Sequence, residues 1–138
     1  MSTGFSRLQV FGYRRLQNLD LPLAPLNVLI GANGVGKTSV LEVMSLLAAS
    51  ADGRMEGAIS DSGGISSLVT HGRKEPMELR LDMPMPGQSP IQYELRLSVS
   101  ALGFGIPVES LTQQRETSTK PFKALAASRC PPNISERP

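Results

Sequence analysis

The sequence is poor in aromatic residues, cysteine and histidine, and each shortage argues against a class of function. Four Phe, two Tyr and no Trp are too few for a stacking platform that binds single-stranded nucleic acid. The only cysteine, Cys130, excludes a disulfide within the chain. The only histidine, His71, is expected to be a loop or surface residue, so a Cys/His zinc site is not indicated. These counts are compatible with a reducing cytoplasm, which is the expected location.

Long apolar runs are also missing. No run reaches 18 residues, so no membrane-spanning helix is expected, and the first residues lack the apolar core of a signal peptide. The 14 basic and 12 acidic residues nearly cancel, and a net charge of +2 does not by itself indicate a nucleic-acid partner. A chain of 138 residues, 40% of them hydrophobic, fits one globular domain or part of a larger one.

Alternation of apolar and polar residues predicts several strands. Residues 8–21 are typical of strand material with a bend at Gly12. Residues 77–83 and 91–99 alternate on either side of a Pro/Gly turn, which predicts an antiparallel hairpin. One more short strand is expected over residues 106–111.

The segment from residue 26 to residue 50 has a different pattern. Residues 26–30 are mostly apolar and stop at Gly31, which predicts a central parallel strand buried on both faces. Residues 37–50 predict a helix with one apolar stripe, formed by Val40, Leu41, Met44, Leu47 and Ala48. The Gly/Ser-rich residues 51–72 predict mainly loop, with a short helix near 65–69.

Between the predicted strand and helix lies the motif G-x-x-x-x-G-K-[ST], as Gly31-Ala32-Asn33-Gly34-Val35-Gly36-Lys37-Thr38. Glycine tolerates positive φ and lets the backbone approach an anion. The loop amides can then form an anion-binding nest, to which the N-terminus of the following helix adds its dipole. The alternative interpretation is a glycine turn with an exposed lysine.

Each position of this P-loop has an expected role in binding a Mg-nucleotide, in the first place ATP. Lys37 is expected to reach the β and γ phosphates, Thr38 to ligate Mg²⁺, and Ser39 to hydrogen-bond the α-phosphate. The full set expected to bind the cofactor comprises Gly31, Asn33, Gly34, Val35, Gly36, Lys37, Thr38 and Ser39. A GTPase is disfavoured because no Asn-Lys-x-Asp motif for guanine is present. A small-molecule kinase is disfavoured because Arg73-Lys74 and Arg129 are poor candidates for a catalytic lid.

Two stretches carry a resemblance to a family. Tyr13-Arg14-Arg15-Leu16-Gln17-Asn18-Leu19-Asp20-Leu21-Pro22-Leu23, followed by residues 26–38, resembles the N-terminal lobe of ABC-type ATPases of the RecF/SMC/Rad50 kind. It is most similar to AAA-family ATPases related to the overcoming-lysogenization-defect nucleases. The resemblance covers about residues 8–111 and is strongest over 13–48. It implies an α/β P-loop NTPase fold: a partial lobe, residues 1–111, with a central strand–P-loop–helix unit and an antiparallel hairpin.

The same resemblance implies the function. ATP binding is expected, with hydrolysis in the complete protein, in DNA repair or phage defence. Arg14 is expected to contact the nucleotide phosphate or ribose, with Arg15 as the alternative. Homodimerisation through the ATPase heads and DNA binding are the implied partnerships.

The departures from the family pattern concern catalysis. No apolar strand ending in Asp-Glu is present, because Leu81-Asp82 is followed by Met83-Pro84. Ser62-Gly63-Gly64 resembles the core of the family's signature motif but follows Lys37 too closely. No catalytic residue is therefore identified, and we expect the N-terminal portion of a longer ATPase, from truncation or a frameshift. The alternative is a non-catalytic nucleotide-binding interaction module.

Residues 112–138 are rich in proline and basic residues. We expect a poorly ordered tail with a helical turn near 122–127. Four of its five basic residues form a basic tail that is either simply solvated or contacts DNA; the four are Arg115, Lys120, Lys123 and Arg129.

Overall fold

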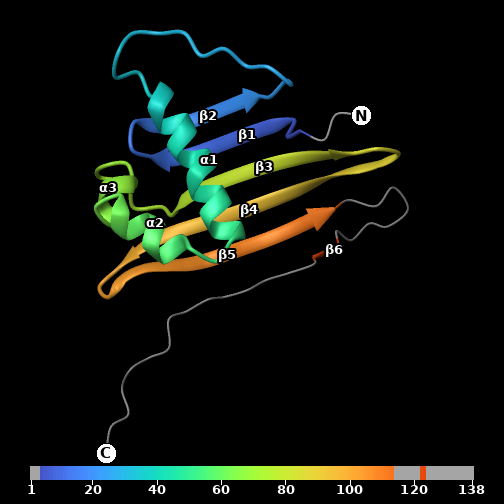
Figure 1. The fold of residues 1–138 in the computed structure, drawn as a ribbon. Coiled ribbons are helices and arrows are strands. Elements are labelled where there is room, and N and C mark those ends of the chain that lie inside the picture. The colour runs from blue at the N-terminus through green and yellow to red at the C-terminus, as the bar shows by residue number, and fades with distance from the viewer. Residues whose placement is uncertain (1–3, 114–121, 124–138) are drawn as a thin grey trace, which may run out of the picture.

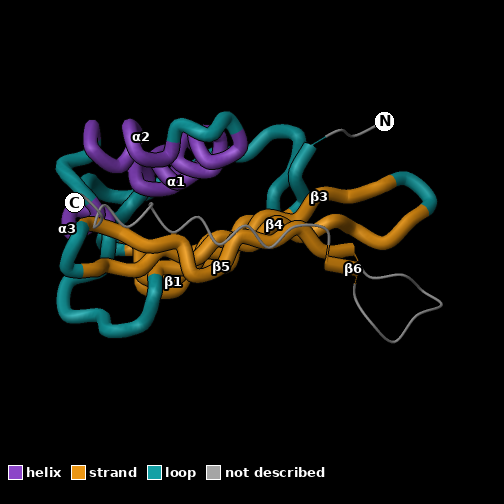
Figure 2. The backbone as a smooth tube through the Cα atoms, turned by 90° about the horizontal axis from the view of Figure 1, so that it is seen from below, coloured by secondary structure: helices purple, strands orange, loops and turns teal. Residues whose placement is uncertain are grey.

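The computed structural model describes residues 4–113 and 122–123. It shows one antiparallel sheet in the order β2-β1-β3-β4-β5-β6, with three helices on one face (Figures 1 and 2). The strands are β1 (Arg7–Tyr13), β2 (Leu16–Pro22), β3 (Met77–Met85), β4 (Gln88–Ser100), β5 (Gly103–Gln113) and β6 (Phe122–Lys123). The helices are α1 (Lys37–Ala51), α2 (Met55–Asp61) and α3 (Ile65–Leu68). The mixed α/β composition agrees with the predicted fold class.

The sheet sorts its side chains by the two-residue period of a strand. Alternate residues of β1, β3 and β4 face the helices and are almost completely buried. Together with apolar residues of the helices they form one core: Leu8, Val10, Tyr13, Leu16, Val43, Leu46, Leu47, Met55, Ile59, Ile65, Leu68, Met77, Leu79, Leu81, Leu95 and Leu97. The predicted hairpin of residues 77–83 and 91–99 is confirmed as β3–β4, and the strand predicted over 106–111 is confirmed within β5.

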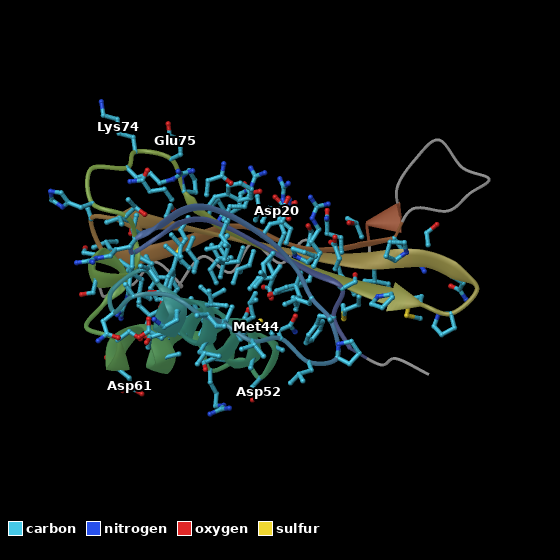
Figure 3. All side chains as sticks on the ribbon, turned by 90° about the horizontal axis from the view of Figure 1, so that it is seen from above. Asp20, Met44, Asp52, Asp61, Lys74 and Glu75 are labelled. Carbon is cyan, nitrogen blue, oxygen red and sulfur yellow. The ribbon has the colours of Figure 1, made fainter. Side chains whose placement is uncertain are left out.

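The other face of the sheet is charged. Figure 3 shows Asp20 on this side, away from the helices. Arg96 of β4 pairs with two glutamates: its Nε lies 3.1 Å from Glu78, directly across on β3, and a terminal nitrogen lies 2.8 Å from Glu94, two residues earlier on β4. Opposite charges at neighbouring register positions stabilise strand pairing modestly, so this face has no need of a covering layer.

The hairpin at the N-terminus differs from the prediction in its turn. Strand character was expected to run on from Tyr13 with a bend at Gly12, but Gly12 lies within β1. The chain turns instead at Arg14-Arg15, between β1 and β2. Apolar alternation alone does not reveal this turn, because an Arg-Arg pair has none of the usual turn chemistry.

The predicted central strand over residues 26–30 is wrong. These residues have no regular secondary structure, and the exposed fractions of Leu26, Val28 and Ile30 are 81, 72 and 91%. In Figure 1 the segment arches from β2 to α1 above the sheet. A parallel strand is stable only when neighbouring strands supply hydrogen bonds and cover both faces, and the described part of the chain supplies no neighbour for it.

The helical region is partly as predicted. The helix expected over 37–50 is confirmed as α1, and the short helix near 65–69 as α3. The predicted stripe is confirmed in part: Leu47 is buried and Val40 and Met44 pack against the core, whereas Ala48 is exposed and Leu41 is 64% exposed. The buried Val43 and Ala49 were not part of the predicted stripe. The Gly/Ser-rich segment also contains α2, which composition did not reveal.

The last described residues add a short strand. Strand β5 continues to Gln113, and Phe122–Lys123 pairs with Thr112 and Gln113 as β6. The helical turn predicted near 122–127 is therefore wrong for residues 122–123. Its other residues lie outside the described part of the chain, as do Arg115, Lys120, Arg129 and Cys130.

Candidate nucleotide-binding site

The glycine-rich loop ends where helix α1 begins. Lys37 is the first residue of α1 and Gly36 is its N-cap. In the first turn of any helix the backbone N–H groups have no carbonyl partner inside the helix. The aligned peptide dipoles add a partial positive charge at the same place. The amide groups of Lys37, Thr38 and Ser39 therefore form a donor surface for an anion.

Two glycines of the loop adopt a conformation that favours glycine. The φ angles of Gly34 and Gly36 are +84° and +110°. A Cβ on Gly36 would lie 2.8 Å from the Cδ2 atom of Leu16, and a Cβ on Gly34 would lie 3.2 Å from an Arg15 nitrogen. Gly31 is not in this positive-φ group, so the sequence-based expectation holds for two of the three glycines.

The Lys37 ammonium group lies over the loop. Its Nζ donates to the carbonyl oxygen of Ala32 at 2.8 Å and also to that of Gly31. An ammonium group has three donors, so two of them fix its direction and one remains for a ligand. A lysine held in this way is a preorganised point charge at the rim of the loop.

Two arginines reach the same loop from the β1–β2 turn. Arg15 donates from a terminal nitrogen to the Gly34 carbonyl oxygen at 3.0 Å. Arg14 has a φ of +46°, the only positive φ of a non-glycine residue in the described ranges 4–113 and 122–123. The hairpin turn thus brings two guanidinium groups beside a loop about 20 positions further along the sequence.

The glycine loop, the turn and the start of α1 enclose a pocket of about 290 Å³. Its lining residues are Arg14, Arg15, Asn33, Gly34, Gly36, Lys37, Thr38 and Ser39. Three of them are cationic and none is a carboxylate, so the pocket suits a multiply charged anion such as a phosphate chain. Gly31 and Val35, also expected in the site, belong to the loop but do not line this pocket.

The sequence assigns no role to Glu42, a carboxylate in contact with one of the residues that line the pocket. Glu42 of α1 accepts a hydrogen bond from the Tyr13 hydroxyl at 3.2 Å and lies 3.4 Å from an Arg14 nitrogen. Burial, and then the negative charge of Glu42, raise the pKa of Tyr13 to about 12. The available signal was that Glu42 is the only acid in the predicted helix.

A larger cavity, of about 370 Å³, lies between the second half of α1 and strands β3 to β5. Its lining includes Met44, Leu47, Leu81, Met83 and Tyr93. The lining is almost wholly apolar, so it has no cation or amide cluster to hold phosphate. The smaller pocket at the glycine loop is therefore the better candidate for the nucleotide-binding site.

Other functional groups are scarce among the described residues. They contain no cluster of three or more His, Cys, Asp or Glu side chains able to hold a metal ion. His71 is exposed, as expected. No helix found in the described ranges is both long and apolar enough to cross a membrane.

Three curated relatives are similar in sequence to parts of this chain, two of them over about 40 residues and one over 120. An OLD nuclease of Thermus scotoductus is 49% identical over 41 residues, which is 30% of this chain and 8% of that protein. A DNA replication and repair protein RecF of Salmonella arizonae is 54% identical over 43 residues, or 30% of this chain and 12% of that protein. RecF of an Enterobacter species is 29% identical over 120 residues, or 79% of this chain and 33% of that protein. The chain thus spans a third or less of these relatives.

A family model matches as well. It is described as "AAA domain, putative AbiEii toxin, Type IV TA system" and matches residues 26–123, which is more than half of the chain. The matched range starts at the segment before the glycine loop and includes α1 and the β3–β5 meander. The chain therefore belongs to this AAA-domain family, as a partial N-terminal lobe of the RecF-like, ABC type.

Proposed function

We propose that the chain binds the triphosphate of Mg-ATP at residues 31–39. The observation that carries the proposal is the convergence of Lys37, Arg14 and Arg15 on one glycine loop at a helix N-terminus. Backbone amides at such a place bind phosphate without regard to the rest of the ligand. Among phosphate ligands, ATP is supported by the AAA family match and the RecF-like relatives.

The residues present fit a magnesium nucleotide. Thr38 lines the pocket one residue after Lys37, at the position whose hydroxyl ligates the cation in a P-loop. Ser39 follows in the same turn and is proposed to contact the α-phosphate. Bound Mg²⁺ would neutralise part of the phosphate charge and fix the phosphate oxygens in place, while the loop amides and Lys37 orient the phosphate chain.

The test is a titration of the full chain with Mg-ATP, followed by calorimetry. We expect a dissociation constant between micromolar and millimolar, and at least about a tenfold loss of affinity in Lys37→Ala, since a charge-assisted hydrogen bond is removed. Lys74→Ala, an exposed lysine that does not line the pocket, is the matched control. Equal affinity in both variants would refute the role of Lys37.

Hydrolysis is proposed for the complete ATPase rather than assigned to these residues. Phosphoryl transfer needs a group that positions the attacking water, and no carboxylate lines the pocket. A non-catalytic nucleotide-binding module therefore stays as the alternative for this chain. Phosphate release above the buffer background that disappears in Lys37→Ala would exclude that alternative.

The family likeness also supports a larger assembly. We propose that residues 1–111 belong to one ATPase lobe, with 112–138 as a tail, and that such lobes pair through their nucleotide sites. The relatives named for DNA replication and repair support a DNA role in repair, whereas a role in phage defence is proposed from the family resemblance alone. Filter binding that falls steeply with salt would support DNA contact, and no salt-sensitive retention would count against it.

A further inference from the structure

Glu42 lies in an unfavourable place for a phosphate site. It projects from the same helix as Lys37, five residues further on, and its carboxylate lies 3.4 Å from a nitrogen of Arg14, which lines the pocket. A negative charge this close to bound phosphate repels it. The Glu42 and Arg14 side chains are 34 and 35% exposed, and a partly exposed ion pair contributes little to folding stability. Neither a gain in folding stability nor an attraction to the phosphates explains why a carboxylate occupies this position.

The Arg14 guanidinium is confined by more than this ion pair. Its Cζ lies 5.8 Å from the centre of the Tyr13 ring, a separation typical of a cation–π contact. The Tyr13 hydroxyl in turn donates to the same Glu42 oxygen that faces Arg14. Tyr13 is almost completely buried. A rigid aromatic ring therefore fixes the carboxylate that faces the arginine.

The backbone of Arg14 is confined as well. Its φ of +46° is a conformation that costs free energy in a non-glycine residue. Its N–H donates to the Leu68 carbonyl oxygen at 2.6 Å, and its own carbonyl oxygen accepts from the Thr70 hydroxyl at 2.8 Å. Strained residues held from several sides are concentrated at functional sites. Backbone and side chain of Arg14 are thus both fixed at the edge of the loop pocket.

We propose that Glu42 is a positioning residue, which holds the Arg14 guanidinium in the direction of the nucleotide phosphates. The proposal rests on the proposed ATP site and deepens it. Fixing a long side chain in advance removes an entropy cost from binding. The gain from an ordered Arg14 then exceeds the repulsion between Glu42 and phosphate.

The experiment compares Glu42→Gln with the parent chain in the Mg-ATP titration. Simple charge repulsion predicts that the variant binds more tightly, because a negative charge is removed. Positioning predicts the opposite: affinity falls roughly fivefold, because Arg14 loses a charged partner. Glu56→Gln, which alters an exposed glutamate of α2, is the control and should change nothing. Tighter or unchanged binding in Glu42→Gln would overturn the proposal.

A double-mutant cycle with Arg14→Gln shows whether Glu42 acts through Arg14. We expect the double variant to bind no more weakly than Arg14→Gln alone. Fully additive losses would overturn the positioning role, because Glu42 would then act on the nucleotide by another route.

A readout without nucleotide separates this proposal from the ATP site itself. In ¹H–¹⁵N spectra of the arginine Nε groups, Arg14 should give a dispersed signal that moves to the averaged position of mobile arginines in Glu42→Gln. An unchanged Arg14 signal would overturn the proposal even if ATP binds. If ATP does not bind at all but the signal collapses, the ATP site fails while the fixing of Arg14 by Glu42 is upheld.

Discussion

Leu79 at the centre of the sheet is completely buried, whereas Ile30 at the entrance to the glycine loop is 91% exposed, although both lie in runs that predict strands. The difference lies in the neighbours. Leu79 has β1 on one side and β4 on the other, and the helices cover its face. Residues 24–30 have no such partners in the described part of the chain. A strand pattern therefore becomes a strand only where other segments complete its ladder.

The largest expected contrast is in folding stability. Leu79→Ala should lower the free energy of unfolding by about 2–5 kcal/mol, because it leaves a cavity in the core. Ile30→Ala should change it by less than about 0.5 kcal/mol, as for other exposed positions. Urea unfolding followed by circular dichroism measures both. A large loss of unfolding free energy in Ile30→Ala would show that residues 26–30 are packed in solution. It would contradict the difference between the two regions.

A glycine of the loop and a glycine of the packed helical layer should respond differently to replacement by alanine. Gly36→Ala should cost about 1–3 kcal/mol, since its φ is +110° and the new Cβ would lie 2.8 Å from Leu16. It should also weaken Mg-ATP binding, because the start of α1 must shift. Gly57 lies within α2, and a Cβ there meets nothing, so Gly57→Ala should stabilise by about 0.5–1 kcal/mol. Thermal unfolding and calorimetry measure the two effects, and equal melting temperatures would contradict the prediction.

Alkaline pH should lower the folding stability through two tyrosines of the packed layer. Burial raises the pKa of both Tyr13 and Tyr93 to about 12, whereas the pKa of an unfolded tyrosine is about 10. Above pH 10 the unfolded chain loses these protons first, so stability is complete below about pH 10 and falls between about pH 10 and 12.

Replacement of either tyrosine by phenylalanine should remove the part of this loss of folding stability that comes from that tyrosine. Urea unfolding of Tyr93→Phe at pH 7, 10 and 11.5 measures the slope, and each pH is compared with the parent chain. A slope equal to that of the parent would contradict the assignment to Tyr93.

The smallest effect is expected on the charged outer face. Asp20 accepts hydrogen bonds from Arg7, one of them 2.7 Å long from Nε, and these bonds lower its pKa. A lowered carboxyl pKa stabilises the fold above the unfolded value and ceases to do so as pH falls through the folded value. Both groups are exposed, so Asp20→Asn should shift the melting temperature slightly at low salt and not at high salt. A shift that persists at high salt would show a more buried pair.

Sequence patterns predicted most of the packed layer. The alternation over 77–83 and 91–99 predicted the β3–β4 hairpin, and the helical spacing of apolar residues over 37–50 predicted α1. Three features were missed because they depend on neighbours: the turn at Arg14-Arg15, helix α2, and the burial of Val43 and Ala49 on α1. Leu41 and Val43 are equally apolar, and only the position of the sheet decides that Val43 is the buried one.

The candidate site likewise combines features that the local sequence predicts with contacts that only the fold reveals. The spacing of Gly34, Gly36, Lys37 and Thr38 predicts a phosphate-binding loop before a helix, because the motif is local to eight residues, and the structure confirms that α1 begins at Lys37. Arg14 came from the family resemblance, and Arg15 was its alternative. Glu42 was visible in the sequence only as a lone acid, and its contact with Tyr13 and Arg14 spans 28 positions or more. No local pattern encodes such a contact.

By itself, the sequence determined that a glycine-rich P-loop motif directly precedes a helix and which stretches alternate, because both follow from composition and spacing within a few residues. The tertiary structure decided where the hairpin turns, which side of α1 is buried, and that residues 26–30 remain outside the sheet. It also decided that two arginines and a glutamate meet beside the glycine loop. These outcomes depend on hydrogen-bond partners and covering surfaces far apart along the chain, whose arrangement is fixed only when the sheet forms.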